Sequence, residues 1–293
     1  MDAQTRSRRN GPLLSLAVLA SLHVAGVALL LHEPRPLALV HECAFWAASL
    51  IGVAGTLRAT RAFLPGDHLR RVWGLLAAGA CLLFVGTAMR SYWIAVAGAT
   101  PFAASPLLPY RMAVVVLANV VSTYALLLLA FTYQRAGLSP PLTARALALW
   151  AVGLAAALLV AVPQLRLDLA QLQRGVAQAL SATTSIVSTL GDTLTILLIV
   201  PLLRVAHLMR GGRLARVWWM MGLSGAVWLV YDARAWLALL VPGQEAEALE
   251  LLRVTRTLGL ATVGVAGWLQ HAALAATPAA PQAAREEPQL PAA

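Results

Sequence analysis

The sequence contains no lysine, and all 22 of its basic residues are arginine. Without a lysine amine there is no Schiff-base chemistry of the kind that holds retinal in a rhodopsin. Cysteine is also scarce: Cys43 and Cys81 fall at different depths of two apolar segments, so we expect no disulfide between them. No Cys-x-x-Cys pair or Cys/His cluster suggests zinc, iron–sulfur or covalent haem, and we expect no cofactor.

Charge is scarce as well, since 12% of the residues are charged and 60% are hydrophobic, with a mean hydropathy of +0.75. A water-soluble domain cannot bury that much apolar surface, so we expect the lipid bilayer to be the main partner. The net charge of +10 would suggest nucleic acid in a soluble protein. Here the arginines lie between apolar runs, where they set topology and contact anionic headgroups, so no nucleic-acid binding is expected.

The apolar runs predict an all-α, polytopic integral membrane helix bundle. A membrane-spanning helix needs about 20 apolar residues. Eight runs qualify, near 12–31, 36–57, 72–97, 110–133, 144–162, 181–203, 217–240 and 251–274. The first run is not followed by a small-residue cleavage site, so we expect it to stay attached as a helix and not to act as a signal peptide.

Arginine counts in the short connections predict the orientation in a bacterial inner membrane. The arginine-rich connections fall on the side of both termini, which places both termini in the cytoplasm. Residues 1–11 would form a basic cytoplasmic N-terminus. Residues 275–293, rich in proline and alanine, would form a disordered cytoplasmic tail. The tryptophans Trp73, Trp218 and Trp219 would lie at the cytoplasmic interface.

The stretch "PGDHLRRVWGLLAAG" at 65–79 is repeated in part by "RGGRLARVWWMMGLSG" at 210–225, at the offset that takes Trp73 to Trp218. The offset pairs two helices of each half, which predicts two four-helix units, 12–133 and 134–274, in a parallel 4+4 repeat. The alternative is that arginine followed by tryptophan marks any cytoplasmic membrane boundary.

Within the second unit, 163–180 is predicted to be an amphipathic segment that lies on the outer surface or extends the sixth span outward.

Asp192 is the strongest candidate for a functional residue, because an ionisable group inside a bilayer costs about 2.5–3.5 kcal/mol on insertion scales. Helical spacing places a stripe of hydroxyl side chains on its face: Ser181, Thr184, Ser185, Ser188 and Thr195. The stripe predicts a polar cavity with Asp192 as a proton- or cation-binding residue. The alternative is that these side chains only hydrogen bond to neighbouring helices.

Asp232 is the second candidate, since Trp228, Tyr231 and Asp232 share one face of the seventh run. The predicted counter-ions are Arg256 and Arg90, and the alternative is an Asp232–Arg256 ion pair that fixes helix register. Glu42 is interpreted as interfacial, and Asn119, Ser122 and Thr123 as interhelical contacts.

A haem site would need two histidines at one depth on facing helices. The pairs that match in predicted depth are His32 with His41 and His207 with His271, while His23 falls in mid-span. No other feature supports a haem.

The sequence therefore predicts an inner-membrane protein with a polar cavity that binds or transports a small solute or proton. The first alternative is a non-transporting sensory or scaffold protein that acts through a cytoplasmic partner at Arg204–Arg216. A lipid-modifying enzyme is the third and least favoured alternative, because no catalytic motif stands at its required spacing. We expect no catalytic residue and no metal site.

Overall fold

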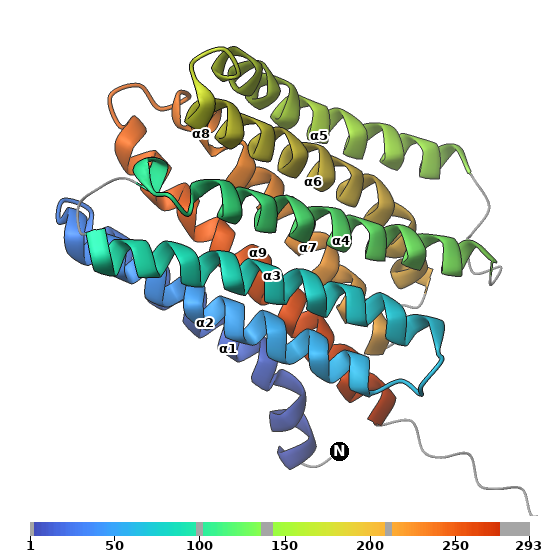
Figure 1. Ribbon diagram of the computed structural model, residues 1–293. Coiled ribbons are helices and arrows are strands. Elements are labelled where there is room, and N and C mark those ends of the chain that lie inside the picture. The colour runs from blue at the N-terminus through green and yellow to red at the C-terminus, as the bar shows by residue number, and fades with distance from the viewer. Residues whose placement is uncertain (1–2, 98–101, 136–142, 209–212, 276–293) are drawn as a thin grey trace, which may run out of the picture.

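The computed structural model describes residues 3–97, 102–135, 143–208 and 213–275, all of which are helical or in turns (Figure 1). The elements are α1 (Ala3–Leu30), α2 (Pro34–Arg61), α3 (His68–Ala97), the short 3-10 helix η1 (Phe102–Ala104), α4 (Leu108–Arg135), α5 (Ala144–Gln171), α6 (Val176–Leu208), α7 (Arg213–Asp232), α8 (Arg234–Ala238) and α9 (Glu245–Ala275). The predicted tail at 276–293, and the side chains of most of the segment 204–216, lie outside this description.

Seven helices within the described residues are long and apolar enough to cross a membrane: α1 to α6 and α9. The chain is therefore a multi-pass membrane protein. The sequence predicted an eighth span at 217–240, but this run does not form one helix. It is interrupted at Ala233, so that α7 ends at Asp232 and α8 covers only Arg234–Ala238.

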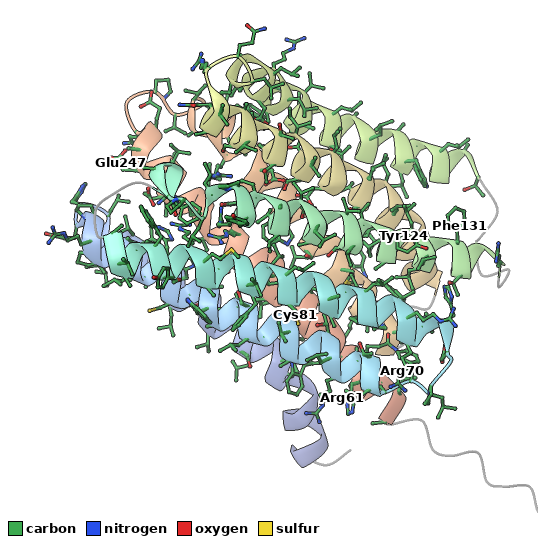
Figure 2. The ribbon with its side chains drawn as sticks, in the orientation of Figure 1. Arg61, Arg70, Cys81, Tyr124, Phe131 and Glu247 are labelled. Atoms are coloured by element: carbon green, nitrogen blue, oxygen red, sulfur yellow. The ribbon has the colours of Figure 1, made fainter. Side chains whose placement is uncertain are left out.

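Large apolar side chains cover the outside of the bundle, as expected where lipid is the solvent. Leu29 of α1, Val152 and Leu159 of α5, and Phe131 of α4 are all exposed. Charged side chains gather at the two ends instead. Figure 2 shows Arg61 and Arg70 at one end of the bundle and Glu247 at the other. The long axis of the bundle is thus the direction in which it crosses the membrane.

The helices run antiparallel to their neighbours in sequence, and α9 lies in the middle of the bundle (Figure 1). Helix α9 packs against α1, α2, α7 and α8, while α4 packs against α3 and α6. The turns α1–α2, α5–α6 and α8–α9 lie at the same end as η1, which we call the η1 end.

Helices α2 and α9 approach each other closely at glycines. A Cβ atom added at Gly55 would collide with the backbone of Gly264, and one added at Gly267 would collide with the backbone of Gly55. Small residues allow helices in lipid to approach closely and gain van der Waals contact. These glycines hold the central helix α9 against α2.

We therefore expect Gly55→Ala to destabilise the fold by about 1–3 kcal/mol, the usual range for overpacking a well-packed contact. The added methyl group meets backbone, which cannot rotate out of the way. The measurement is thermal unfolding in detergent. Gly74→Ala is the matched control, because its Cβ would meet only Thr60 Cγ2 at an ordinary 3.8 Å. Equal melting temperatures for the two variants would contradict the tight α2–α9 contact.

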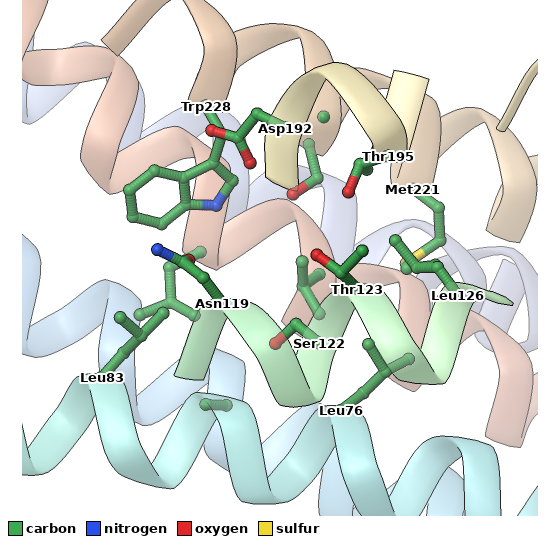
Figure 3. Close-up of a pocket in the computed structure, with 15 residues that line it drawn as sticks. Leu76, Leu83, Asn119, Ser122, Thr123, Leu126, Asp192, Thr195, Met221 and Trp228 are labelled. Carbon is green, nitrogen blue, oxygen red and sulfur yellow. The ribbon is translucent and has the colours of Figure 1, made fainter. Parts of the chain in front are cut away.

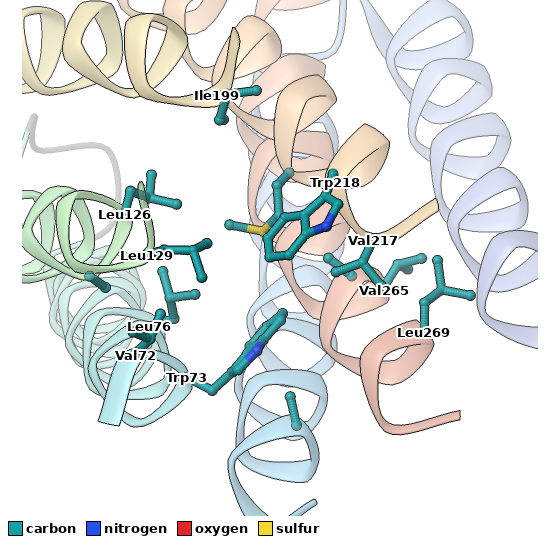
Figure 4. Packing of buried hydrophobic residues seen from close by; sticks show 14 of the residues in the cluster. Val72, Trp73, Leu76, Leu126, Leu129, Ile199, Val217, Trp218, Val265 and Leu269 are labelled. Carbon is teal, nitrogen blue, oxygen red and sulfur yellow. The ribbon is translucent and has the colours of Figure 1, made fainter. Parts of the chain in front are cut away.

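The largest hydrophobic cluster joins α2, α3, α4, α6, α7 and α9 at the end away from η1 (Figure 4). Trp73 and Trp218, the tryptophans of the repeated motif, are both 2% exposed and pack inside it. The sequence predicted that they face the membrane interface. Of the three predicted interfacial tryptophans, Trp219 faces outward and is 55% exposed. The motif therefore supplies core packing, because each ring points at neighbouring helices and not at lipid.

The segment 163–180, predicted to be a single amphipathic element, is divided in the structure. Its first part continues α5 through Pro163 to Gln171, and its last part begins α6 at Val176. Between them is a turn in which Gly175 has a φ of +120°, a conformation that favours glycine. The segment thus joins two long helices and does extend the sixth predicted span towards the η1 end.

Candidate functional site

Asp192 is the central residue of the 33-residue helix α6. Asp192 and Asp232, the last residue of α7, line the same cavity. Asp232 is 8% exposed, and its Oδ2 atom has no hydrogen-bond partner. This carboxyl pair is the centre of the candidate site.

A polar cavity of about 160 Å³ lies beside the carboxyl pair, in the half of the bundle nearer the η1 end. We call it the arginine cavity. Three arginines line it: Arg111, Arg234 and Arg256. Its other polar side chains are Asn119, Ser181, Thr184, Ser185, Ser188, Asp192, Tyr231 and Asp232, and its apolar side chains include Phe45, Leu83, Met112, Val115 and Trp228.

A second cavity of about 70 Å³ lies on the other side of Asp192. Figure 3 shows Asp192 and Thr195 on one side of it and Asn119, Ser122 and Thr123 of α4 on the other. Asp192, Asn119, Trp228 and Leu83 line both cavities. The carboxyl group of Asp192 therefore stands where the two cavities meet.

The structure places the whole predicted hydroxyl stripe of α6 on cavity walls. Ser181, Thr184, Ser185 and Ser188 line the arginine cavity, and Thr195 lines the second cavity. Ser188 accepts a hydrogen bond from Asn119 Nδ2 of α4. Asn119, Ser122 and Thr123, which the sequence suggested as interhelical contacts, also line these cavities.

Trp228 and Tyr231 reach the arginine cavity from α7, as their shared face predicts. Their rings meet edge to face with centroids 5.8 Å apart. The Arg234 guanidinium lies 4.0 Å from the centroid of the Tyr231 ring and donates a hydrogen bond to the Tyr231 carbonyl at 2.7 Å. Arg256 lines the cavity from α9 with its guanidinium 3.6 Å from the centroid of Phe45.

The predicted counter-ions of Asp232 have other partners in the structure. Arg90 pairs with Glu42, with Nε and Oε1 3.0 Å apart, and Ser91 donates a further hydrogen bond of 2.6 Å to Glu42. Arg256 forms no ion pair with Asp232 among the described side chains. Glu42 was interpreted as interfacial, but it is 6% exposed, because α2 begins at Pro34 and carries it roughly 12 Å into the helix.

Sequence reasoning missed three charged residues around the site. Arg111 and Arg234, which the sequence analysis did not single out, both line the arginine cavity, and Arg111 Nε donates to the Gly86 carbonyl at 3.2 Å. Asp168 is 3% exposed and accepts a hydrogen bond from Gln164 at 3.0 Å. It is buried because α5 runs on to Gln171. The leucines at 165, 169 and 172 were the available signal of that extension.

Three further side chains, those of His23, His41 and Glu250, are linked by hydrogen bonds near the η1 end. His23 Nε2 lies 2.9 Å from His41 Nδ1, and His41 Nε2 lies 2.9 Å from Glu250 Oε2. The sequence placed His23 deeper than His41, but each lies seven residues from the α1–α2 turn, counted from Leu30 and from Pro34. His41 therefore meets His23 and not His32. In the helices described, no group of three or more His, Cys, Asp or Glu side chains is placed to hold a metal ion.

The arrangement can exchange a proton at the carboxyl pair and can bind a polar solute between α4, α6, α7 and α9. Both abilities follow from an ionisable pair set beside cavities with hydroxyl, amide and guanidinium groups on their walls. Comparison of the chain with protein-family models, with curated proteins and with solved structures finds no match.

Proposed function

We propose that this chain is a bacterial inner-membrane transporter that binds a small solute and moves it together with a proton. The observation that carries the proposal is the carboxyl pair of Asp192 and Asp232: both residues line the arginine cavity, and Asp192 also lines the second cavity. Proton relays in membrane proteins are built from such intramembrane acids. In this proposal the pair gains and loses a proton as the solute passes.

The break between α7 and α8 supports a transport function. Transporter binding sites commonly lie where a helix is interrupted near the bilayer midplane, because the interruption frees backbone groups and allows movement. Here the interruption at Ala233 directly follows Asp232. The segment after the break brings Arg234 into the arginine cavity. A local change at this break would thus move both a carboxyl group and a guanidinium group of the site.

The 4+4 repeat is part of the same proposal, and the helix neighbours support it. Within the first half α1 packs on α2, α2 on α3 and α3 on α4; within the second, α5 packs on α6, α6 on α7 and α7 on α9. Between the halves, α2 packs on α9 and α4 on α6. The cavities lie between the two halves, since α4 and α6 face each other across them. With both termini cytoplasmic, the η1 end faces outward.

The experiment is proton flux into vesicles containing the purified chain. A pH-sensitive dye inside the vesicles reports the flux under an imposed membrane potential, with and without small solutes outside. Protein-containing vesicles are expected to change internal pH faster than protein-free vesicles. Equal rates with every solute would contradict the proposal.

A further inference from the structure

The arginine cavity contains more positive than negative charge. The guanidinium groups of Arg111, Arg234 and Arg256 all line it, and among the side chains described none of the three forms an ion pair. Two carboxyl groups in the lining, those of Asp192 and Asp232, stand against these three guanidinium groups, while the buried Asp168 lies outside the lining and accepts a hydrogen bond from Gln164. The one ion pair next to the cavity, Arg90 with Glu42, is already neutral.

The three guanidinium groups have only weak partners in the structure. Arg111 donates to a backbone carbonyl and lies 5.2 Å from the centroid of Phe102. Arg234 and Arg256 lie against the rings of Tyr231 and Phe45. Guanidinium groups in a low-dielectric interior are stabilised far more by an anion than by a carbonyl or an aromatic face. An anion is therefore the kind of solute that these three groups favour.

The cavity also limits the size and character of that anion. An apolar cavity of about 150 Å³ holds benzene, so a cavity of about 160 Å³ takes a solute of roughly six to eight non-hydrogen atoms. Phe45, Leu83, Met112 and Val115 add apolar side chains to the lining, which suits a carbon skeleton better than a bare inorganic ion. Asp232 lines the same cavity, so its carboxyl group supplies an acceptor for a hydroxyl group of the solute.

We infer that the solute is a small organic carboxylate, held through its carboxylate group by Arg111, Arg234 and Arg256, with a hydroxyl group that donates to Asp232. This inference rests on the proposed function, because it names the solute of the same cavity. A carboxylate presents two oxygens in the geometry that a guanidinium fork matches. The 2-hydroxy acids, such as lactate with six non-hydrogen atoms, have both groups and the required size.

The test is binding measured by thermal unfolding of the purified chain in detergent, because a ligand of the folded state raises the melting temperature. The probes are lactate, propionate (which lacks the hydroxyl group), inorganic phosphate and glycerol. We expect lactate to stabilise most, propionate less, and glycerol not at all. Arg256→Gln is expected to weaken lactate binding roughly tenfold to a hundredfold, the effect of losing a hydrogen bond to a charged group.

The control variant is Arg253→Gln, one turn away on α9, whose arginine pairs with Glu250 outside the cavity and whose loss should leave lactate binding unchanged. If Arg256→Gln fails to fold, Arg111→Gln provides the same test from α4. Equal stabilisation by phosphate and lactate would overturn the carboxylate inference. Lactate binding in phosphatidylcholine nanodiscs that disappears in phosphatidylglycerol nanodiscs would overturn it too, in favour of a lipid headgroup.

The two proposals fail in different ways. Proton flux that depends on Asp192, combined with no binding of any carboxylate, overturns the carboxylate inference and leaves the transporter proposal standing. Lactate binding that depends on Arg256, with no proton flux, keeps the anion site and overturns proton-coupled transport.

Discussion

Replacing Asp192 with asparagine is expected to lower the proton flux of the reconstituted chain to the rate of protein-free vesicles. Asparagine has nearly the same shape as aspartate and can still hydrogen bond, so the bundle should fold. Its amide cannot take up or release a proton as the carboxyl group does. The measurement is the rate of internal pH change under an imposed potential, with the fold checked by circular dichroism.

Asp67→Asn is the matched control for this variant. Asp67 lies in the α2–α3 turn, where its Oδ1 accepts a hydrogen bond of 2.9 Å from the backbone N–H of Leu69. Asparagine fills the same capping role equally well, so flux and stability should both match the wild type. Wild-type flux in Asp192→Asn vesicles would show that the carboxyl pair does not carry the proton.

Replacing Arg90 with methionine is expected to destabilise the bundle by about 3 kcal/mol. The change leaves Glu42 buried between α2 and α3 without its ion-pair partner, and an unpaired buried charge is the costly result of breaking such a pair. Adding Glu42→Gln to the same chain should recover most of the loss, because the remaining group is neutral and can still hydrogen bond to Ser91. Urea or thermal unfolding in detergent measures both steps.

Arg253→Met offers the comparison for this prediction. Arg253 also pairs with a carboxylate, Glu250, but both side chains are partly exposed to solvent at the η1 end, where such pairs contribute less than about 1 kcal/mol. If Arg253→Met loses as much unfolding free energy as Arg90→Met, burial does not decide the cost of breaking an ion pair. The same conclusion would follow if adding Glu42→Gln to Arg90→Met recovers no stability.

The sequence predicted the polar stripe of α6 because one helix of fixed periodicity determines which side chains share a face. Asp192, Ser188 and Thr195 needed no knowledge of neighbouring helices, and their depth followed from the length of the apolar run. The all-helical, multi-pass class followed for the same reason, since composition and run length are properties of single segments.

The partners of the site could not be predicted in the same way. Arg90 meets Glu42, and Arg256 meets Phe45, because of how α2, α3 and α9 pack, and spacing along one helix does not contain that information. Helix ends were the second source of error. Asp168 fell outside the predicted spans because α5 ends later than its apolar run indicates.

Trp73 and Trp218 illustrate a third limit. An arginine followed by tryptophan at the end of an apolar run is typical of a membrane interface, and the sequence pattern is the same whether the ring faces lipid or a neighbouring helix. Packing alone decides between them. Here both rings point into the bundle, and the neighbouring Trp219 points out.

The central claim, a water-accessible polar cavity in the middle of the membrane, is tested most directly by cysteine labelling. In a chain with Cys43 and Cys81 replaced by alanine, Ser188→Cys places a thiol on the arginine cavity, and Leu190→Cys places one on the outward face of the same helix. We predict that a charged, membrane-impermeant thiol reagent labels Ser188→Cys and leaves Leu190→Cys unlabelled. An unlabelled Ser188→Cys in folded protein would show a closed, dry interior and contradict the account.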